Sequence, residues 1–472
     1  MVMGQLKQDT DLVIIGAGPG GYVAALRAAD LGQDVTLIEA ADKLGGVCLR
    51  EGCIPSKALI NVVEIADAAR HGEQFGINVS GLEIDRAKLR EWTASVVEGL
   101  TGGVRGLLEG RGVQVIKGRA RFDGPNSLAL EDAEVSGIQF KHCIIATGSR
   151  INELPAAYDL PVWSSAEALT IPEIPDSLLV VGGGYIGLEM GMIYAGLGSR
   201  VTMVEFFPSL LQGADADLVR VVVKSAKQRF ESIHTDSKVV KLEKGGAGYI
   251  ATIEKDGKEE KVETAQVLVA VGRRPNTDNI ALEMAGLETD EQGRIPTDEQ
   301  CRTALPHIFA IGDVAPGPML AHKASREAKV AAETIAGHDA AFDNRAIPAV
   351  VFTDPELAWT GLTEREAEEK KIPVKIGRFP LSALGRARTL GRNEGLAKVL
   401  SDPESGRVLG VGMVGPMASE LIAEGTLALE MGATLEDIMV TIHPHPTLSE
   451  AIIEAAEAAA GSAIHISAPK KP

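Results

Sequence analysis

The feature that most constrains the fold of this chain is a long pattern that occurs twice. The stretch LVIIGAGPGGYVAALRAADLGQDVTLIEA begins at Leu12, and LLVVGGGYIGLEMGMIYAGLGSRVTMVEF begins at Leu178, 166 residues later. Each copy predicts a buried strand, a glycine turn, a helix of small residues and a second strand that ends in an acid. The positions that match across the offset are Gly16, Gly18, Gly21 and Glu39 in the first copy and Gly182, Gly184, Gly187 and Glu205 in the second.

This spacing is typical of a dinucleotide-binding βαβ unit. The first glycine permits a tight turn, the second lets backbone amides approach a pyrophosphate, and the third lets the helix pack against the strand. The N-terminus of the helix stabilises the phosphate charge, and the acid lies where a ribose hydroxyl can donate to it. A single glycine motif is often only a turn, but two complete units, each with its acid, predict two bound dinucleotides.

Three further segments read as strands that end in a turn. HCIIATGSR carries Thr147 and Gly148 at the end of its strand, AQVLVAVGRRPN turns at Gly272, and HIFAIGDVA carries Asp313 near its end. An α/β sheet presents groups to a ligand at the carboxyl ends of its strands. Asp313 could instead cap the segment that follows it, but its place in this series favours a hydroxyl acceptor for a cofactor chain.

From about residue 346 the pattern becomes α+β and carries no nucleotide signature. GLAKVLSD and VLGVGMVG predict antiparallel strands around the turn PESGR. We therefore expect an α/β protein with two Rossmann-like dinucleotide-binding domains and a C-terminal α+β domain. The expected boundaries are residues 1–150 and 275–345 for the first dinucleotide domain, 151–274 for the second and 346–472 for the C-terminal domain.

Length and charge narrow the class of protein. A chain of 472 residues suffices for about three domains of ~150 residues each. Its net charge of -18 argues against nucleic acid or an anionic membrane as the main partner. We find neither a membrane span nor a secretory signal in MVMGQLKQDTDLVII. With only four cysteines, the sequence predicts a cytoplasmic protein, in which a persistent structural disulfide is disfavoured.

Two of the cysteines, Cys48 and Cys53, lie five positions apart in GGVCLREGCIPSKAL. A zinc site needs a second pair of ligands, which Cys143, inside a predicted strand, and the isolated Cys301 do not supply, so we expect no metal site. Two unrelated buried thiols remain an alternative. Cys53 precedes a predicted helix, however, whose dipole favours a thiolate at that position. We interpret the pair as a redox couple.

A redox couple and two dinucleotides together predict a path for electrons. A flavin is the usual mediator between a nicotinamide, which carries hydride, and a thiol pair. Such a path needs a proton acceptor beside the outer thiol, and HPHPTLSE offers His443 and His445, with Glu450 five residues after the second. These could be two loop histidines fixed by prolines, or one could be a general base that the carboxylate orients.

Over essentially its whole length the chain resembles the flavoprotein pyridine nucleotide–disulfide oxidoreductases, and within that family most closely the members that oxidise dihydrolipoyl groups. The segments that carry the resemblance are GGVCLREGCIPSKAL, GYIGLEMG and HPHPTLSE. The resemblance implies FAD at the first glycine unit, NAD at the second, and a homodimer whose C-terminal domain forms the interface. It also implies roles for single residues: Cys48 meets the substrate, Cys53 faces the flavin, Lys57 and Glu189 form an ion pair near the flavin, Ile186 lies near the nicotinamide, Asp313 holds the FAD chain, and His445, oriented by Glu450, is the acid/base of the neighbouring subunit.

The reaction that the resemblance implies is oxidation of a protein-bound dihydrolipoyl group. Phe206 and Phe207 follow Glu205, without an arginine that would hold a 2′-phosphate, so NAD is favoured over NADP. The lipoyl-bearing partner could be a 2-oxo acid dehydrogenase acyltransferase, a glycine cleavage carrier or a lipoate-binding protein. Two alternatives are an NADH-dependent reductase of another disulfide and a non-catalytic assembly subunit, against which the intact cysteines and histidine argue.

The chain departs from the usual family pattern at a few positions. Val47 stands where the family usually has Thr, Arg50 and Glu51 replace an Asn-Val-like pair, and Pro444 stands where Ala is common. None of these changes removes a catalytic group, but they bear on the redox potential and on the identity of the disulfide partner.

Overall fold

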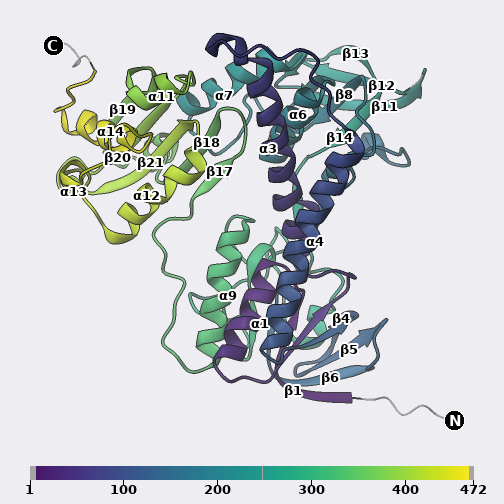
Figure 1. The fold of residues 1–472 in the computed structure, drawn as a ribbon. Coiled ribbons are helices and arrows are strands. Elements are labelled where there is room, and N and C mark those ends of the chain that lie inside the picture. The colour runs from purple at the N-terminus through teal and green to yellow at the C-terminus, as the bar shows by residue number, and fades with distance from the viewer. Residues whose placement is uncertain (1–6, 247, 467–472) are drawn as a thin grey trace.

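The computed structural model describes residues 7–246 and 248–466, which form three lobes in space (Figure 1). Within these residues the strands form sheets of seven, four, three, two and five members. The first lobe holds the N-terminal strand and the segment around residues 308–335, the second holds the middle of the chain, and the third is the C-terminal part. Residues 1–6 and 467–472, the outer ends of the expected first and last domains, lie outside the described residues.

The first lobe is built from the beginning of the chain and from a later segment that returns to it. Its elements are β1 (Lys7–Ile15), α1 (Pro19–Asp30), β2 (Val35–Glu39), α2 (Gly46–Glu51), α3 (Cys53–Arg70), a 3-10 helix (Gly72–Phe75), α4 (Arg86–Gly110), β3 (Gln114–Lys117), β4 (Arg119–Gly124), β5 (Ser127–Glu131), β6 (Gly137–Ile145), α8 (Leu282–Ala285), β16 (Ile308–Ala310), a 3-10 turn (Gly312–Val314) and α9 (Ala321–Ile335). The sheet order is β3-β2-β1-β6-β5-β4, with β16 parallel to β6. Because β16 pairs with β6, α9 lies beside α1 although the two helices are far apart in sequence (Figure 1).

The second lobe repeats the strand–helix–strand arrangement of the first. Its elements are β7 (Ser149–Ile151), a 3-10 helix (Pro155–Ala157), α5 (Ser165–Leu169), β8 (Ser177–Val181), α6 (Tyr185–Leu197), β9 (Arg200–Val204), α7 (Ala216–Arg229), β10 (Ser232–His234), β11 (Lys238–Gly245), β12 (Gly248–Lys255), β13 (Lys258–Thr264), β14 (Gln266–Val269) and β15 (Arg273–Pro275). α3, which begins in the first lobe, packs along α6 of the second (Figure 1). The parallel sheet β10-β9-β8-β14 is accompanied by an antiparallel sheet of β11, β12 and β13 and by a ribbon of β7 and β15. The predicted pair of βαβ units is therefore present.

The third lobe is α+β, as the sequence predicted. Its elements are β17 (Ala349–Val351), β18 (Glu356–Gly361), α10 (Glu364–Lys370), β19 (Lys375–Pro380), a 3-10 helix (Leu381–Ala383), α11 (Gly385–Thr389), β20 (Leu396–Ser401), β21 (Val408–Gly415), α12 (Ala418–Met431), α13 (Leu435–Val440) and α14 (Glu450–Ala460). The antiparallel sheet has the order β17-β18-β21-β20-β19. β20 and β21 pair across the turn that PESGR predicted.

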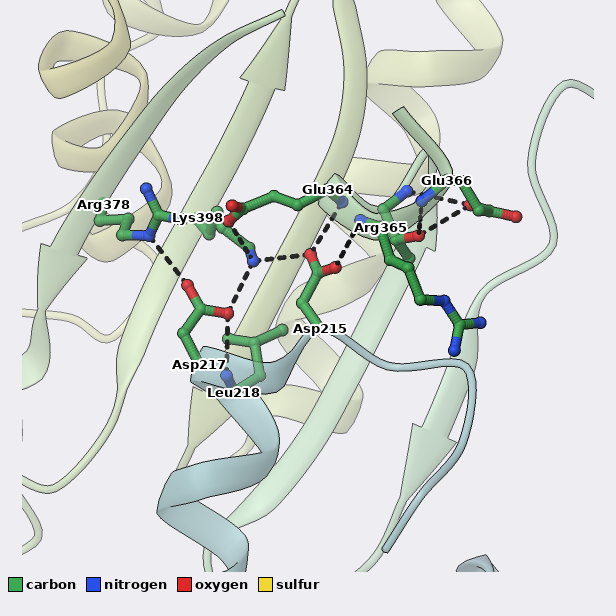
Figure 2. A network of polar contacts seen from close by, with 9 residues as sticks. Asp215, Asp217, Leu218, Glu364, Arg365, Glu366, Arg378 and Lys398 are labelled. Atoms are coloured by element: carbon green, nitrogen blue, oxygen red, sulfur yellow. Dashed lines mark hydrogen bonds and ion pairs between the residues drawn. The ribbon is translucent and has the colours of Figure 1, made fainter. Parts of the chain in front are cut away.

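A buried ion cluster joins the second lobe to the third (Figure 2). Lys398 on β20 is 0% exposed, and its Nζ lies 2.6 Å from Asp215 and 2.8 Å from Asp217, at the start of α7, and 2.7 Å from Glu364 on α10. Arg378 on β19 donates to both Asp217 and Glu364. Burial opposes ionisation of Asp217, but the hydrogen bonds from Lys398 and Arg378 outweigh it and lower the pKa of this carboxyl. The two lobes therefore share one set of compensated charges.

The cores are aliphatic, since the β1 residues Leu12, Val13 and Ile14 are fully buried and similar residues fill the other sheets. In the part of the chain that the structure describes, no helix combines the length and the apolar character that a membrane span requires.

Candidate active site

The turn between β1 and α1 requires glycine at two positions, and a third glycine lies beside a cavity. Gly16 has a φ of +100°, and a Cβ there would lie 2.4 Å from the carbonyl oxygen of Ala146. A Cβ on Gly21 would lie 1.7 Å from the carbonyl oxygen of Gly16, so strand and helix can approach only because the side chain is missing. Gly18 precedes the first residue of α1 and borders a cavity. This is the position from which a helix N-terminus stabilises a phosphate.

Glu39 is fixed by the backbone on both sides of its carboxylate. Oε2 accepts a hydrogen bond from Ala17 N at 2.8 Å, and Oε1 accepts one from Ala41 N at 2.8 Å. Each carboxylate oxygen has a second lone pair, and Glu39 lines the cavity. The carboxylate is therefore held still and can accept a further hydrogen bond from a ribose hydroxyl.

A cavity of ≈ 930 Å³ joins the first glycine turn to the cysteine pair, at the upper end of the range for ligand pockets. The motif residues of the first unit that line it are Gly16, Gly18, Glu39, Lys57, Thr147, Gly148 and Asp313. Cys48 and Cys53 line it as well, and so do Ile186 and Glu189 from the second unit. The large volume, the helix N-terminus at Gly18 and the fixed acid at Glu39 fit an extended dinucleotide such as FAD.

Cys48 and Cys53 come from two helices that meet at Gly52. Cys48 lies within α2, which the sequence did not predict, and Cys53 is the first residue of α3. Both are free thiols in the structure. Their mutual hydrogen bond raises the pKa of Cys48 and, together with the charge of Lys57 and against burial, lowers the pKa of Cys53 to about 7. Cys53 is therefore the thiol that ionises first.

Lys57 and Glu189 form an ion pair between the two units. Lys57 lies one turn after Cys53 on α3, Glu189 lies on α6, and the distance between Nζ and Oε2 is 2.7 Å. The Glu189 side chain is 5% exposed. Although Glu189 belongs to the second glycine unit, it lines the cavity of the first. This places a positive charge beside Cys53 and balances it with a buried carboxylate.

Asp313 lies in the turn after β16 and is held by a neighbour in the cavity wall. Its carboxylate accepts from Ser149 Oγ at 2.5 Å, and Ser149 Oγ accepts from Arg273 Nε at 2.8 Å. Thr147 donates from Oγ1 to the carbonyl oxygen of Asn276 at 2.7 Å. These contacts fix the strand ends that the sequence analysis singled out.

Sequence reasoning missed a buried ion pair behind this turn. Lys323 and Glu327 on α9 lie 2.7 Å apart and are almost fully buried. Glu327 accepts from Gly312 N at 2.7 Å, and Lys323 donates to Gly312 O at 3.2 Å, so the pair grips the peptide next to Asp313 on both sides. Burial raises the pKa of Glu327. The only available signal was an i,i+4 Lys–Glu spacing, which usually marks a helix surface.

The second glycine turn has the same geometry as the first. A Cβ on Gly182 would lie 2.3 Å from Ala270 O, and one on Gly187 would lie 1.9 Å from Gly182 O. Glu205 accepts from Gly183 N at 2.5 Å and from Phe207 N at 2.8 Å. These two donors correspond to Ala17 and Ala41 across the same offset of 166 residues.

The surroundings of the second turn differ from those of the first. A Cβ on Gly184 would meet no atom within 4 Å, and Gly272, with a φ of +99°, forms the turn after β14. Among the described residues, those that line the cavity do not include Gly182, Gly184, Gly187, Glu205 or Gly272. These glycines of the second turn therefore do not line the cavity, and Gly184 is exposed, although Tyr185 and Ile186, which follow it, do line the cavity.

The two histidines of HPHPTLSE have different environments. His445 is 78% exposed, and its Nδ1 lies 2.8 Å from Glu450 Oε1. Burial opposes ionisation of Glu450, but hydrogen bonds from Thr447 N and from His445 lower its pKa. His443 is 6% exposed and lies 2.7 Å from Glu424. Neither His445 nor Glu450 is among the described residues that line the cavity of its own chain.

Comparison with known proteins places these features in a family. The model of the pyridine nucleotide–disulphide oxidoreductases matches residues 10–328, and the model of their dimerisation domain matches residues 347–456. Dihydrolipoyl dehydrogenases from Geobacillus stearothermophilus and Haloferax volcanii are 47% and 48% identical to the chain, over 99% and 98% of it and 99% of each relative. The crystal structure of LpdA from Mycobacterium tuberculosis superposes with a TM-score of 0.87 at 28% identity, covering 95% of this chain and 99% of that one. The chain belongs to the pyridine nucleotide–disulphide oxidoreductase family.

Proposed function

We propose that this protein is an FAD enzyme that oxidises dihydrolipoyl groups with NAD through a Cys48–Cys53 redox pair. Its cofactors are FAD and NAD, and it forms a homodimer. The observation that carries the proposal is the position of the cysteines, which line one cavity together with the first glycine unit and with Glu189 of the second. Curated relatives that match almost the whole chain are named dihydrolipoyl dehydrogenase, and this supports the substrate class.

The thiol chemistry is a disulfide exchange at Cys48. In the oxidised protein, a dihydrolipoyl thiolate attacks Cys48 Sγ and breaks the Cys48–Cys53 bond, which releases Cys53 as a thiolate. The second lipoyl thiol then attacks the sulfur of the lipoyl group bound to Cys48, which forms the cyclic lipoyl disulfide and frees Cys48 as a thiol. When bound, FAD supplies the two-electron chemistry that returns the Cys48–Cys53 pair to the disulfide and passes the electrons to NAD. Lys57 stabilises the Cys53 thiolate, whose pKa of about 7 lets it persist at neutral pH.

The proton of the attacking thiol goes to His445 of the partner subunit. Because Glu450 occupies Nδ1, the free Nε2 is the atom that receives the proton. The high exposure of His445 within its own chain supports a role at the surface that meets a second copy. A two-fold dimer then has two active sites, each with cysteines from one chain and a histidine from the other.

The remaining assignments follow from the same roles. We assign residues 1–150 and 275–345 to FAD, 151–274 to NAD and 346–472 to the dimer interface. The partner that carries the lipoyl group is a 2-oxo acid dehydrogenase acyltransferase, a glycine cleavage carrier or a lipoate-binding protein. A cytoplasmic location is in keeping with the low cysteine content of the chain.

Turnover measurements test the proposed substrate. The purified yellow protein should reduce NAD with dihydrolipoamide and should act poorly on glutathione disulfide with NADH. The opposite preference would identify a reductase of another disulfide.

A mixing experiment tests the shared site. Cys48→Ser and His445→Gln proteins, each inactive alone, should regain about a quarter of wild-type activity when unfolded and refolded together. Random pairing makes about half of the dimers hybrids, and each hybrid has one working site of its two. No recovery in proven hybrids would place all four groups on one chain.

A further inference from the structure

Phe352 brings the third lobe to the cysteine pair of its own chain. The residue directly follows β17, and its ring lies beneath the Lys57 ammonium, with Nζ 4.3 Å from the ring centroid. Its backbone N donates to Glu189 Oε1 at 3.1 Å. Glu189 binds Lys57 through its other oxygen. One residue of the third lobe therefore contacts both members of the ion pair.

Two contacts restrict the ammonium, although the Lys57 side chain is 32% exposed. A carboxylate lies on one side of Nζ and the face of an aromatic ring on another, and a cation over a ring face is attracted by the ring quadrupole. The Glu189 carboxylate is itself pinned by the Phe352 amide in a nearly dry environment. A lysine side chain otherwise samples many rotamers, so this arrangement selects the one in which the charge stays near Cys53.

We propose that Phe352 is a positioning residue of the redox site. Its ring and its backbone amide hold the Lys57 ammonium and its partner Glu189 where the ammonium stabilises the Cys53 thiolate. The inference rests on the proposed function, in which that thiolate is the reduced form of the pair. The charged and titratable groups that act on Cys53 are Cys48 on α2, Lys57 on α3, and Glu189 and Tyr185 on α6. Of these, only Lys57 favours the thiolate by its charge, and Glu189 opposes it. Phe352 therefore controls the position of the Lys57 ammonium relative to Cys53 and Glu189.

The test compares Phe352→Leu, which removes the ring and keeps the apolar bulk, with Phe352→Tyr, which keeps the ring. Reduced holoenzyme is treated with iodoacetamide over a range of pH, and the labelled cysteines are resolved by mass spectrometry after tryptic cleavage at Arg50. Phe352→Leu should raise the midpoint of Cys53 alkylation by about half a pH unit, and Phe352→Tyr should keep the wild-type midpoint. An unchanged midpoint in Phe352→Leu, or the same rise in Phe352→Tyr, would overturn the proposal.

A second comparison separates positioning from a general packing defect. Lys57→Met should raise the midpoint by itself, and adding Phe352→Leu to it should cause no further rise, because Phe352 acts through Lys57. An additive rise would show that Phe352 acts otherwise. If Phe352→Leu does not fold, Phe352→Met replaces it in both experiments.

The alkylation measurement uses no substrate, so it is independent of the proposed function. A protein that shows the predicted midpoints but does not turn over dihydrolipoamide would refute the function and leave only the effect of Phe352 on the Cys53 thiolate, so the two failures can be told apart.

Discussion

The two glycine units of this chain have the same turn but different surroundings. In both, the first and third glycines are required by contacts of 1.7–2.4 Å that a Cβ would make, and in both the acid accepts from two backbone amides at matching positions. The first turn, however, opens into a cavity of ≈ 930 Å³ that α9 and the Gly312 turn help to close, whereas the described glycines of the second turn do not line this cavity and Gly184 is exposed. We infer that the repeated motif fits a pyrophosphate in both units and that the elements outside the motif determine how far a bound ligand is enclosed.

The largest expected effect of this difference is on cofactor retention. An enclosed FAD should stay with the protein, about one per chain, while NAD should leave, as a coenzyme that exchanges in every turnover must. We expect the two dissociation constants to differ by roughly 10⁴-fold, about 5.5 kcal/mol. Gel filtration followed by absorbance spectroscopy, with calorimetric titration of NAD, measures this. Colourless folded protein, or NAD that coelutes in equal amount with FAD, would remove the distinction.

The second unit also differs from the first in its attachment to the third lobe through Lys398. Lys398→Met leaves three carboxylates close together with Arg378 still paired to two of them, so we expect a loss of about 3 kcal/mol in the free energy of unfolding. The exposed Lys375→Met on β19 is the matched control and should change it by less than about 0.5 kcal/mol. Denaturant unfolding at a fixed protomer concentration measures both, and equal effects would show that the cluster does not stabilise the joint.

The same cluster predicts a direction for the pH dependence of stability. Because folding lowers the pKa of Asp217, its contribution is fully present above the ordinary carboxyl value and is lost as the pH falls through the lower folded value. Lys398→Met should reduce this part of the acid sensitivity. A wild-type slope in the variant as the pH falls below the ordinary Asp pKa would contradict the assignment.

Matched glycine substitutions test whether the two units work separately. Gly21→Ala should weaken FAD binding, and Gly187→Ala should weaken NAD binding in a protein that remains yellow, because each Cβ would meet a backbone oxygen at less than 2 Å. Overpacking of this kind costs about 1–3 kcal/mol, which corresponds to a ~10- to 100-fold loss of affinity. Flavin content and NAD titration give the result. Loss of FAD in both variants would mean that the second turn also supports the first cavity.

The acids give the smallest expected effect. Glu205→Gln removes the charge that repels a 2′-phosphate, so the preference for NAD over NADP should fall roughly tenfold, about 1.4 kcal/mol. Glu39→Gln should weaken FAD binding by a similar factor without changing the coenzyme preference. The specificity constants for NAD and NADP are measured in both variants. A changed coenzyme preference in Glu39→Gln would show that the roles of the two acids are assigned wrongly.

The sequence predicted those parts of the molecule that a local pattern determines. The repeat at an offset of 166 predicted the two strand–turn–helix units, and PESGR predicted the hairpin of β20 and β21. The helix predicted after Cys53 is α3, which begins at Cys53 itself. In each case the residues that determine the geometry lie within about one turn or one βαβ unit of each other, so their spacing is visible in the sequence.

The parts that could not be predicted depend on contacts between distant residues. Lys398 meets Asp215 and Asp217 across more than 180 residues, and Phe352 meets Lys57 across almost 300. Lys323 and Glu327 have the spacing of a surface pair, and only the return of β16 to the first sheet buries them. A lysine carries no mark in sequence that separates a buried charge from a solvated one, because burial is decided by what packs over it.

The cluster around Lys398 also has a consequence for the response of the protein to its ionic surroundings. Asp215, Asp217 and Glu364 supply converging carboxylates of the kind that hard divalent cations take as ligands. The ammonium that lies among them is covalently part of the chain (Figure 2). A tethered cation does not dissociate, is not extracted by a chelator and does not compete with magnesium for its place. The contact between the second and third lobes therefore keeps its geometry when the concentration of free divalent metal changes. A contact held by a bound ion would loosen under the same change.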